Sequence, residues 1–360
     1  MSGDYGTILT GDALAVLRTL PDQSVQCCVT SPPYWGLRDY GVPGQIGLEP
    51  TVEEHIATLT EVFREVRRVL CDDGTLWVNY GDTYSANRGY QVPDSKFRDV
   101  GNNACSRCSL SCGLPPKNLL GLPWRLAFAL QADGWYLRSD IIWHKPNPMP
   151  ESVKDRPTRA HEYIFLLSKS ERYYYDHEAV RELAAPSYKG NAKTFRGGGT
   201  YTADNSFDNS FGKERDSHGN TPVGGSRYSF RREDSKRAQG PATHPQGTHR
   251  PDRDDTRYCG PTRARRDVWT VATRGFPNAH FATFPPDLIR PCVLAGCPAG
   301  GVVLDPFFGA GTVGVVCVEE ARRYLGIEIN SDYVEMAERR IGQARPKGPR
   351  PLSLLDMGVA

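Results

Sequence analysis

The sequence predicts an α/β fold, in which helices are layered on a β-sheet. Short apolar segments of strand composition alternate with longer segments whose apolar residues recur at helical spacing. Early in the chain a buried strand is followed by two prolines, and late in the chain another strand is followed by a glycine-rich loop and a helix. Ligands of open α/β sheets bind beyond the carboxyl ends of strands. Both turns are therefore candidate parts of a functional site.

Length and composition restrict the class of protein. At 360 residues the chain can hold one large domain or two of ordinary size. Apolar residues make up 39% and charged residues 24% of it, as in globular proteins. No apolar run approaches the roughly 20 residues that cross a bilayer, and residues 1–6 lack the features of a signal peptide. We therefore expect a cytoplasmic protein with no membrane partner.

Residues 1–180 are expected to form the first part of the α/β domain. Apolar residues recur with a helical period from Val52 to Leu70, and Asp72-Asp73-Gly74 is expected to end that helix. Strands are expected at residues 7–10, 25–30, 75–80, 136–144 and 162–168, and a further helix at residues 121–132.

Residues 181–266 differ from the rest of the chain. They are rich in Gly, Ser, Asn, Arg and Pro and contain few aliphatic residues, so they cannot easily bury a core of their own. They carry 17 Lys and Arg against 10 Asp and Glu, a balance of +7, which leaves −5 for the remainder of a chain whose total is +2. A basic segment of this kind favours a polyanionic partner, and a solvated insert is the alternative.

Residues 267–345 return to the α/β pattern, and residues 346–360 are expected to form a flexible tail. Strands are expected at 302–305 and 324–328, and helices from Gly311 onward and at 332–341. Between the first strand and the first helix, residues 304–312 read Leu-Asp-Pro-Phe-Phe-Gly-Ala-Gly-Thr.

This glycine loop has the features of a small-ligand site. Glycines let a ligand approach the backbone where a side chain would collide, and the helix start offers free N–H groups and a positive dipole end. Glu328 ends the next strand, where an acidic residue can accept hydrogen bonds from ribose hydroxyls. No Walker lysine follows the loop, which disfavours a nucleotide phosphate. The alternative is that the loop is only a packing turn of a β-α-β unit and binds no ligand.

The Pro-Pro turn has the features of a reacting site for an amino group. Residues 30–35 read Thr-Ser-Pro-Pro-Tyr-Trp at the end of a buried strand. Two prolines remove two N–H donors and leave stiff carbonyls free to accept hydrogen bonds. Ser31 and one such carbonyl could receive both protons of an exocyclic NH2, and Tyr34 could stack on the base that carries it. The alternative is a structural Pro-Pro turn whose aromatic side chains only fill space.

Together these two blocks resemble the amino-group DNA methyltransferases of the β arrangement, in which the catalytic block comes first, the recognition region second and the glycine loop last. The resemblance covers about residues 5–180 and 267–342. It implies a class I S-adenosylmethionine-dependent methyltransferase fold, a permuted Rossmann-like mixed sheet with helices on both faces, plus an irregular target-recognition insert at residues 181–266. It also implies S-adenosylmethionine as methyl donor, double-stranded DNA as partner, and direct transfer to a flipped base.

The resemblance also implies roles for individual residues. Further matching blocks are Gly11-Asp12, residues 141–148 and 161–165, and residues 276–285. Catalysis is assigned to Ser31, Pro32, Pro33 and Tyr34, and contact with the target base to Trp35, Trp143, Lys145 and Asn147. Cofactor contacts are assigned to Asp12, Thr30, His280, Phe284, Asp305, Pro306, Phe307, Gly309, Gly311, Thr312 and Glu328.

The target base is a finer question. Members of this family with Ser before Pro-Pro-Tyr mostly methylate cytosine N4, and those with Asp or Asn mostly methylate adenine N6. Ser31 therefore favours cytosine N4. Adenine N6 stays open, because both bases present a similar amino group.

The ten cysteines are expected to be reduced in the cytosol, as thiols or as metal ligands. Cys105, Cys108 and Cys112 lie in a loop at about residues 84–116 and could bind zinc, although a structural zinc site takes four ligands. Free thiols are the alternative. The cysteines in apolar stretches are expected in the core: Cys27, Cys28, Cys292 and Cys317.

Competing functions remain for this sequence. An RNA or protein methyltransferase could share both motifs, although protein-glutamine enzymes usually carry Asn in place of Ser31 and have the glycine loop first. A non-catalytic DNA-binding protein with the same fold and a dinucleotide-dependent oxidoreductase are further alternatives. A cognate restriction endonuclease and a monomeric or homodimeric state are also compatible with the sequence.

Overall fold

The computed structural model describes residues 5–37, 42, 44–85, 113–183, 262–273 and 284–346, and the backbone of two short strands between residues 200 and 208. The chain divides into two compact units. The first comprises Met1–Glu182 and Ala264–Ala360, and the second comprises Leu183–Arg263.

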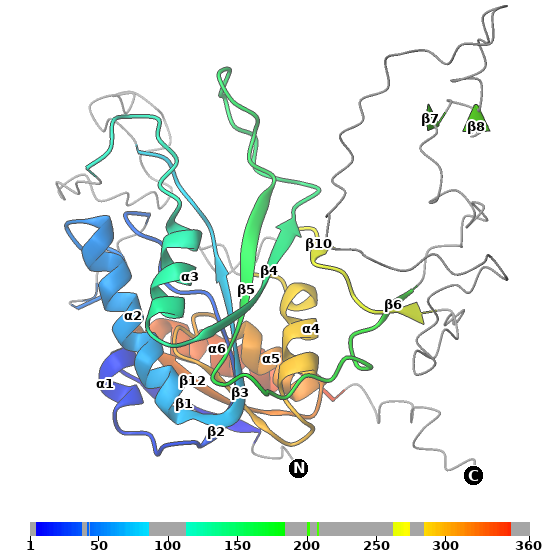
Figure 1. The fold of residues 1–360 in the computed structure, drawn as a ribbon. Coiled ribbons are helices and arrows are strands. Elements are labelled where there is room, and N and C mark those ends of the chain that lie inside the picture. The colour runs from blue at the N-terminus through cyan, green and yellow to red at the C-terminus, as the bar shows by residue number, and fades with distance from the viewer. Residues whose placement is uncertain are drawn as a thin grey trace, which may run out of the picture. The chain divides into compact units, whose positions relative to one another are not determined.

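The described strands of the first unit form one eight-stranded mixed sheet (Figure 1). Its order is β1-β12-β11-β2-β3-β5-β4-β10. Neighbours are parallel except where β5 pairs with β3 and β4. The strand bounds are β1 Gly6–Thr10, β2 Val25–Thr30, β3 Leu70–Tyr80, β4 Tyr136–His144, β5 His161–Ser168, β10 Val268–Thr270, β11 Val302–Asp305 and β12 Arg323–Glu328.

The order of the strands creates a switch point between β11 and β2. After β11 the chain continues to its neighbour β12 on one side, and after β2 it continues to β3 on the other side. The carboxyl ends of two adjacent parallel strands therefore open into a crevice, which is where open α/β sheets bind ligands.

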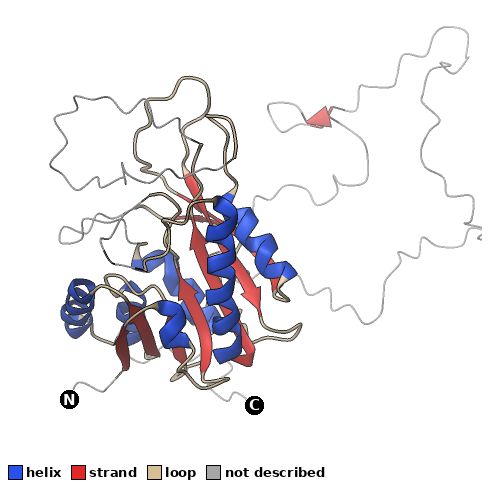
Figure 2. Ribbon diagram, turned by 90° about the vertical axis from the view of Figure 1, so that its left-hand side faces the viewer, coloured by secondary structure: helices blue, strands red, loops and turns tan. Residues whose placement is uncertain are grey.

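Helices cover both faces of the sheet. Successive residues of the central strand β2 alternate between two hydrophobic clusters, Cys28 in one and Cys27 and Val29 in the other. This alternation follows from the period of two along a strand. The first cluster includes residues of α1, α2 and α3, and the second includes residues of α4, α5 and α6. Figure 2 shows helices of one layer in front of the strands.

The helix bounds are α1 Ala13–Leu17, α2 Val52–Val69, α3 Leu122–Ala132, α4 Pro286–Gly296, α5 Thr312–Glu319 and α6 Ser331–Gln343. The longest of them, α2, begins at Thr51, whose side chain accepts a hydrogen bond from the Glu54 N–H at 3.2 Å. Acidic residues in its first turn and Arg67 and Arg68 in its last turn complement the helix dipole.

Most elements of the first unit lie where the sequence predicts them, with four exceptions. The strand expected at 75–80 begins earlier, at Leu70, because the pairing of β2 with β3 continues through a register shift between Val25 and Cys27. The short helix α1, the strand β10 and the helix α4 have no counterpart in the predictions. Helix α4 contains Pro291, a residue that argues against a helix.

The second unit contributes short strands. β7 (Thr200–Tyr201) pairs antiparallel with β8 (Phe207–Asp208), and β6 (Glu182–Leu183) pairs with β9 (Thr262–Arg263). The other residues of this unit lie outside the described ranges, so target recognition by residues 181–266 stays a prediction. The candidate zinc ligands Cys105, Cys108 and Cys112 and the candidate cofactor contact His280 also lie outside those ranges.

Two features of the described residues bear on the expectations. None of their helices is long and apolar enough to cross a membrane. Within the same residues, no group of three or more His, Cys, Asp or Glu side chains is arranged to hold a metal ion. The four cysteines expected in the core, Cys27, Cys28, Cys292 and Cys317, are buried free thiols.

Candidate active site

A cavity of about 770 Å³ opens at the edge of the sheet where the parallel strands end. Its lining comes from the ends of β1, β2, β3, β4, β11 and β12 and from the start of β5. The sequence-predicted residues among its lining are Asp12, Ser31, Pro32, Pro33, Tyr34, Trp143, Lys145, Phe284, Pro306, Phe307, Gly309, Thr312 and Glu328. The fold thus brings together motifs from opposite ends of the chain, from Asp12 to Glu328.

The glycine loop is shaped by two glycines with left-handed backbone. Gly309 has φ 50° and Gly311 has φ 72°, a region that other residues rarely adopt. A Cβ on Gly311 would also lie 2.8 Å from the Cβ of Ala337 in α6. Gly311 is the residue before α5, so the loop delivers the free N–H groups of the first helical turn to the cavity.

Asp305 joins the two strands of the switch point. Its Oδ1 accepts a hydrogen bond from the Thr30 hydroxyl at 2.6 Å and another from the Phe307 N–H at 3.1 Å. Burial raises the pKa of Asp305 to about 7, and the nearby Glu328 charge adds to this effect against the two hydrogen bonds. Thr30 and Asp305 are both buried, so they fix the Pro-Pro turn, residues 31–34, against the glycine loop.

Glu328 holds the loops that follow β11 and β12. One carboxylate oxygen accepts the Gly309 N–H at 2.7 Å and the other accepts the Asn330 N–H at 2.9 Å. Burial raises the pKa of this carboxyl, in opposition to those hydrogen bonds. Each oxygen has a second lone pair, and Glu328 lines the cavity, so it can still accept a hydroxyl.

Two other expected cofactor contacts have structural duties that the sequence does not reveal. Asp12 caps α1, because its side chain accepts the Ala15 N–H at 2.9 Å. The Thr312 hydroxyl accepts a hydrogen bond from Arg340 at 2.9 Å. Both residues also line the cavity, so these hydrogen bonds are compatible with a contact to the cofactor.

Tyr34 of the Pro-Pro turn is held from two sides. Its hydroxyl donates a hydrogen bond to Glu162 at 3.1 Å, and its ring packs edge-on against Tyr80 with 5.1 Å between centroids. Burial raises the pKa of Tyr34 well above its usual value, and the Glu162 charge raises it further, while hydrogen bonding with Ser31 opposes both. Tyr34 is therefore a neutral, positioned aromatic wall of the cavity.

Glu162 at the start of β5 is the centre of a polar network. Besides Tyr34, it forms an ion pair with Lys145, and it accepts a hydrogen bond from the Asn79 side-chain amide at 3.3 Å. The Lys145 ammonium also lies 4.2 Å from the centre of the Trp143 ring. The Trp143 ring, the Lys145 ammonium and the Glu162 carboxylate thus line the cavity together with the Pro-Pro turn.

Comparison with known proteins agrees with this geometry. A family model described as DNA methylase matches residues 25–339. The chain belongs to the DNA methylase family. This confirms the family that the two motifs indicate, and the family covers both N4- and N6-specific enzymes.

Relatives of this methylase match along nearly its whole length. The type II methyltransferase M.Cfr9I of Citrobacter freundii is 49% identical over 336 residues, which cover 93% of this chain and 87% of that protein. M.SmaI of Serratia marcescens is 43% identical over 338 residues, which cover 94% and 91% of the two proteins.

Solved structures confirm the fold. The cytosine-N4-specific PvuII DNA methyltransferase aligns with a TM-score of 0.55 at 17% identity, over 93% of this chain and 86% of that one. The methylase therefore has the class I S-adenosylmethionine-dependent methyltransferase fold, with a mixed sheet between two helical layers.

Two residues expected to contact the target base lie apart from the cavity lining. Trp35 is only 7% exposed and its indole N–H donates to the Glu49 carbonyl at 2.8 Å, which is a core position. Asn147 exchanges hydrogen bonds with Thr273, at 2.9 and 3.1 Å, and so ties the loop after β4 to the segment after β10. Contact of these two residues with the target base stays a prediction.

Gly81 and Asn79 were missed by sequence reasoning. A Cβ on Gly81 would lie 2.7 Å from Cε2 of Tyr34 and 3.3 Å from Cδ of Glu162, so the methylase needs glycine there for space. Asn79 lines the cavity at the end of β3. Neither residue belongs to a recognisable motif, and only the pairing of β3 with β5 brings them to the site.

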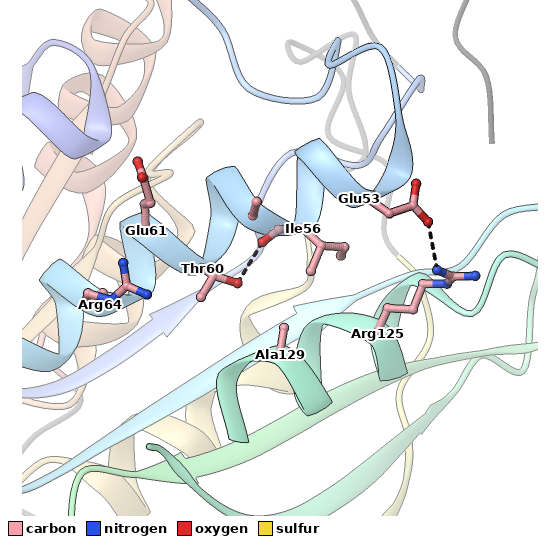
Figure 3. A pocket seen from close by; sticks show the side chains of 8 residues that line it. Glu53, Ile56, Thr60, Glu61, Arg64, Arg125 and Ala129 are labelled. Carbon is pink, nitrogen blue, oxygen red and sulfur yellow. Dashed lines mark hydrogen bonds and ion pairs between the residues drawn. The ribbon is translucent and has the colours of Figure 1, made fainter. Parts of the chain in front are cut away.

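A second hollow lies between α2 and α3 (Figure 3). It measures about 450 Å³ and is lined by Glu53, Ile56, Ala57, Thr60, Glu61, Arg64, Arg125 and Ala129. Within it Arg125 pairs with Glu53 at 3.2 Å, and the Thr60 hydroxyl donates to the Ile56 carbonyl at 2.7 Å. These polar groups are already paired, and the lining contains no Ser, His or Cys.

Proposed function

We propose that this methylase transfers a methyl group from S-adenosylmethionine to the exocyclic N4 of cytosine in duplex DNA. The observation that carries the proposal is the position of Ser31-Pro32-Pro33-Tyr34. This turn lines the same cavity as the glycine loop, and Thr30 beside it is bonded to Asp305 at the start of that loop.

The cavity suits the methyl donor. Its volume of about 770 Å³ lies within the range of small-molecule sites, roughly 300–1,000 Å³. Gly309 and Gly311 keep the loop free of side chains, and Phe284 and Phe307 supply apolar lining. Glu328 offers carboxylate lone pairs for ribose hydroxyls. Carboxylates also favour a ligand with positively charged amino and sulfonium groups.

Once bound, S-adenosylmethionine supplies an electrophilic methyl carbon to the amino nitrogen, and its sulfur keeps the electron pair of the broken bond. The catalytic turn prepares that nitrogen. The Ser31 hydroxyl and a backbone carbonyl of the Pro-Pro turn accept the two amino protons, because prolines leave their carbonyls without competing N–H neighbours. Holding both protons turns the lone pair out of the plane of the base. The methylated nitrogen then releases one proton to water, because neither a hydroxyl nor an amide carbonyl is basic enough to keep it.

The residues around the catalytic turn support cytosine as the target. Tyr34 and Trp143 offer aromatic surfaces to a flipped base. The Lys145 ammonium can donate to the O2 carbonyl of cytosine, and adenine presents only a C–H group in the corresponding place. Ser31 points to the same base by the family pattern. Adenine N6 is the alternative substrate.

The relatives support a role in restriction and modification. M.Cfr9I and M.SmaI are named type II methyltransferases. We infer that this chain protects duplex DNA from a cognate endonuclease, with residues 181–266 contacting the phosphates and bases of the recognition site.

A comparison of two serine variants tests the assignment. Ser31→Ala removes the acceptor at the carboxyl end of β2. The matched control, Ser24→Ala, removes a hydroxyl at the opposite end of the same strand, where it bonds to the Pro21 carbonyl at 2.8 Å. With tritiated S-adenosylmethionine and duplex DNA, we expect Ser31→Ala to lower kcat roughly 100-fold and Ser24→Ala to keep it within twofold. Equal rates for the two variants would refute the role of Ser31, and no transfer by the wild type would favour a non-catalytic DNA-binding protein.

A further inference from the structure

Met149 is the most exposed of the large apolar side chains in the part of the chain that the structure describes. It is 87% exposed, and it nevertheless belongs to the lining of the catalytic cavity. It therefore stands at the mouth of the cavity. A single exposed apolar residue is common on protein surfaces. Exposure alone therefore does not indicate a function, and the rigidity of the backbone that carries Met149 must be considered as well.

The segment that carries Met149 is stiff. Residues 145–150 read Lys-Pro-Asn-Pro-Met-Pro. Each proline fixes its own φ near −65° and restricts the preceding residue to extended backbone. Met149 lies between two prolines, so its main chain has little freedom and its side chain is presented in a defined direction.

Contacts before Met149 anchor the segment to the sheet. The Lys145 N–H donates to the Ala160 carbonyl at 2.8 Å, which closes the base of the loop between β4 and β5. Asn147, two residues before Met149, accepts the Thr273 N–H at 2.9 Å and donates to the Thr273 carbonyl at 3.1 Å. In Figure 1 this loop projects beyond the ends of β4 and β5.

Contacts after Met149 anchor the other side of the loop. Glu151, two residues later, forms an ion pair with Arg156 at 2.6 Å. The Arg156 guanidinium in turn lies 4.0 Å from the centre of the Tyr84 ring. Met149 is thus an exposed apolar side chain on a loop that is anchored on both sides. A loop without a function would not need these anchoring contacts.

We propose that Met149 is a wedge that enters the base stack of the DNA when the target base leaves it. This inference rests on the proposed function, because a base that reaches Ser31 must leave the duplex and so opens a gap at the mouth of the cavity. Methionine is unbranched and flexible enough to fill an irregular gap, and apolar wedges of this size separate base steps in other DNA-binding proteins.

If Met149 acts as a wedge, its substitution should affect methylation of a paired target base and not of an unpaired one. A purely structural role of Met149 would affect both equally. Filling the gap stabilises the opened duplex, so Met149 matters when the target is paired and ceases to matter when pairing is already absent. Met149→Ala removes the side chain beyond Cβ, and Met149→Leu keeps its apolar bulk. Tyr136→Ala is the control, because Tyr136 is 45% exposed and begins β4, roughly 25 Å from the end that carries the loop.

The experiment compares two short synthetic duplexes. The methylated positions are first located by sequencing plasmid DNA treated with the wild-type enzyme. One duplex then carries such a site fully paired, and the other carries it with an abasic residue opposite the target base. We expect Met149→Ala to lower kcat/KM at least tenfold on the paired duplex and to stay within twofold of the wild type on the abasic one. Met149→Leu and Tyr136→Ala should stay within threefold on both.

The outcomes separate the inference from the proposed function. Equal losses on both duplexes, or wild-type rates on the paired duplex, would overturn the wedge. A near-normal rate on the abasic duplex shows in the same assay that Met149→Ala is folded. A wild type that methylates neither plasmid nor duplex would instead refute the proposed function.

Discussion

Gly81→Ala offers a sharp test of the site geometry, because the added methyl group would collide with Tyr34, which we propose to be catalytic. The new Cβ would lie 2.7 Å from Cε2 and 3.2 Å from Cζ of Tyr34. Carbon atoms in contact are normally about 3.5–4.0 Å apart, so the ring must move by about 1 Å. The Glu162 Cδ would also lie only 3.3 Å from the added methyl group, so the methyl group has little space in that direction either.

The expected losses follow from that displacement. A movement of about 1 Å would break the 3.1 Å hydrogen bond from Tyr34 to Glu162, and misplacement on this scale can cost roughly 100-fold in rate. Overpacking would lower the free energy of unfolding by about 1–3 kcal/mol. We therefore expect kcat/KM to fall about 100-fold while the affinity for S-adenosylmethionine changes little, since Tyr34 is assigned to the target base.

Methyl-transfer kinetics, calorimetric titration with S-adenosylmethionine and thermal melting measure these three quantities. Gly342→Ala is the matched control, because nothing lies within 4 Å of a Cβ at that exposed position of α6. It should leave kcat/KM unchanged and stabilise the helix by about 0.5–1 kcal/mol. A Gly81→Ala enzyme with kcat/KM within threefold of the wild type would refute the tight fit of Tyr34 between Gly81 and Glu162.

Three further predictions concern the carboxylates and the glycine loop. Burial raises the pKa of Asp305 from 3.8 to about 7, so the stability that this carboxyl contributes is present below about pH 4 and lost as the pH rises through 7. In urea unfolding the wild type should lose about 3 kcal/mol between pH 5 and 8 relative to Asp305→Asn, and parallel pH profiles would contradict this. Glu162→Gln should lower kcat at least tenfold with S-adenosylmethionine affinity within twofold, by the same kinetics and calorimetry; an unchanged kcat would exclude a positioning role. Gly311→Ala, with φ 72° and a Cβ contact of 2.8 Å to Ala337, should lower stability by about 1–3 kcal/mol and weaken cofactor binding at least tenfold, whereas an unshifted melting temperature and affinity would contradict the loop geometry.

The sequence predicts the elements best where the pattern is local. The strand at 25–30 and the strand at 136–144 lie where the apolar runs place them. Helix α4 was missed because Pro285, Pro286 and Pro291 argue against a helix. Pro286 costs nothing at the first helical position, and the buried residues around Pro291 stabilise the helix despite the lost N–H. Tertiary burial of this kind cannot be read from periodicity.

The residues of the candidate site also differ in whether a local sequence pattern indicates them. Ser31 and Asp305 could be predicted because each belongs to a motif at the end of a strand. Glu162, although inside a matching block, could not be identified as the partner of Tyr34 and Lys145 from spacing alone. Gly81 had no signal, since its need for space depends on the register that pairs Tyr80 with Tyr163. Long-range pairing thus determines the supporting residues of the site.

Trp35 shows the opposite limitation. Its place directly after the catalytic turn favoured contact with the base, but its side chain turns into the core and bonds to the Glu49 carbonyl. The sequence pattern does not reveal that the Tyr34 side chain lines the cavity and the Trp35 side chain does not.

The most direct test of the central proposal is the identity of the methylated nucleoside. Duplex DNA treated with the enzyme and S-adenosylmethionine would be digested to nucleosides and separated by chromatography with mass detection. Standards of N4-methyl-, C5-methyl- and N6-methyl-deoxynucleosides would distinguish isomers of equal mass. We expect N4-methyldeoxycytidine in the wild-type sample and its loss with Ser31→Ala. N6-methyldeoxyadenosine would contradict the assignment of the target base, and no methylated nucleoside at all would contradict the proposed activity.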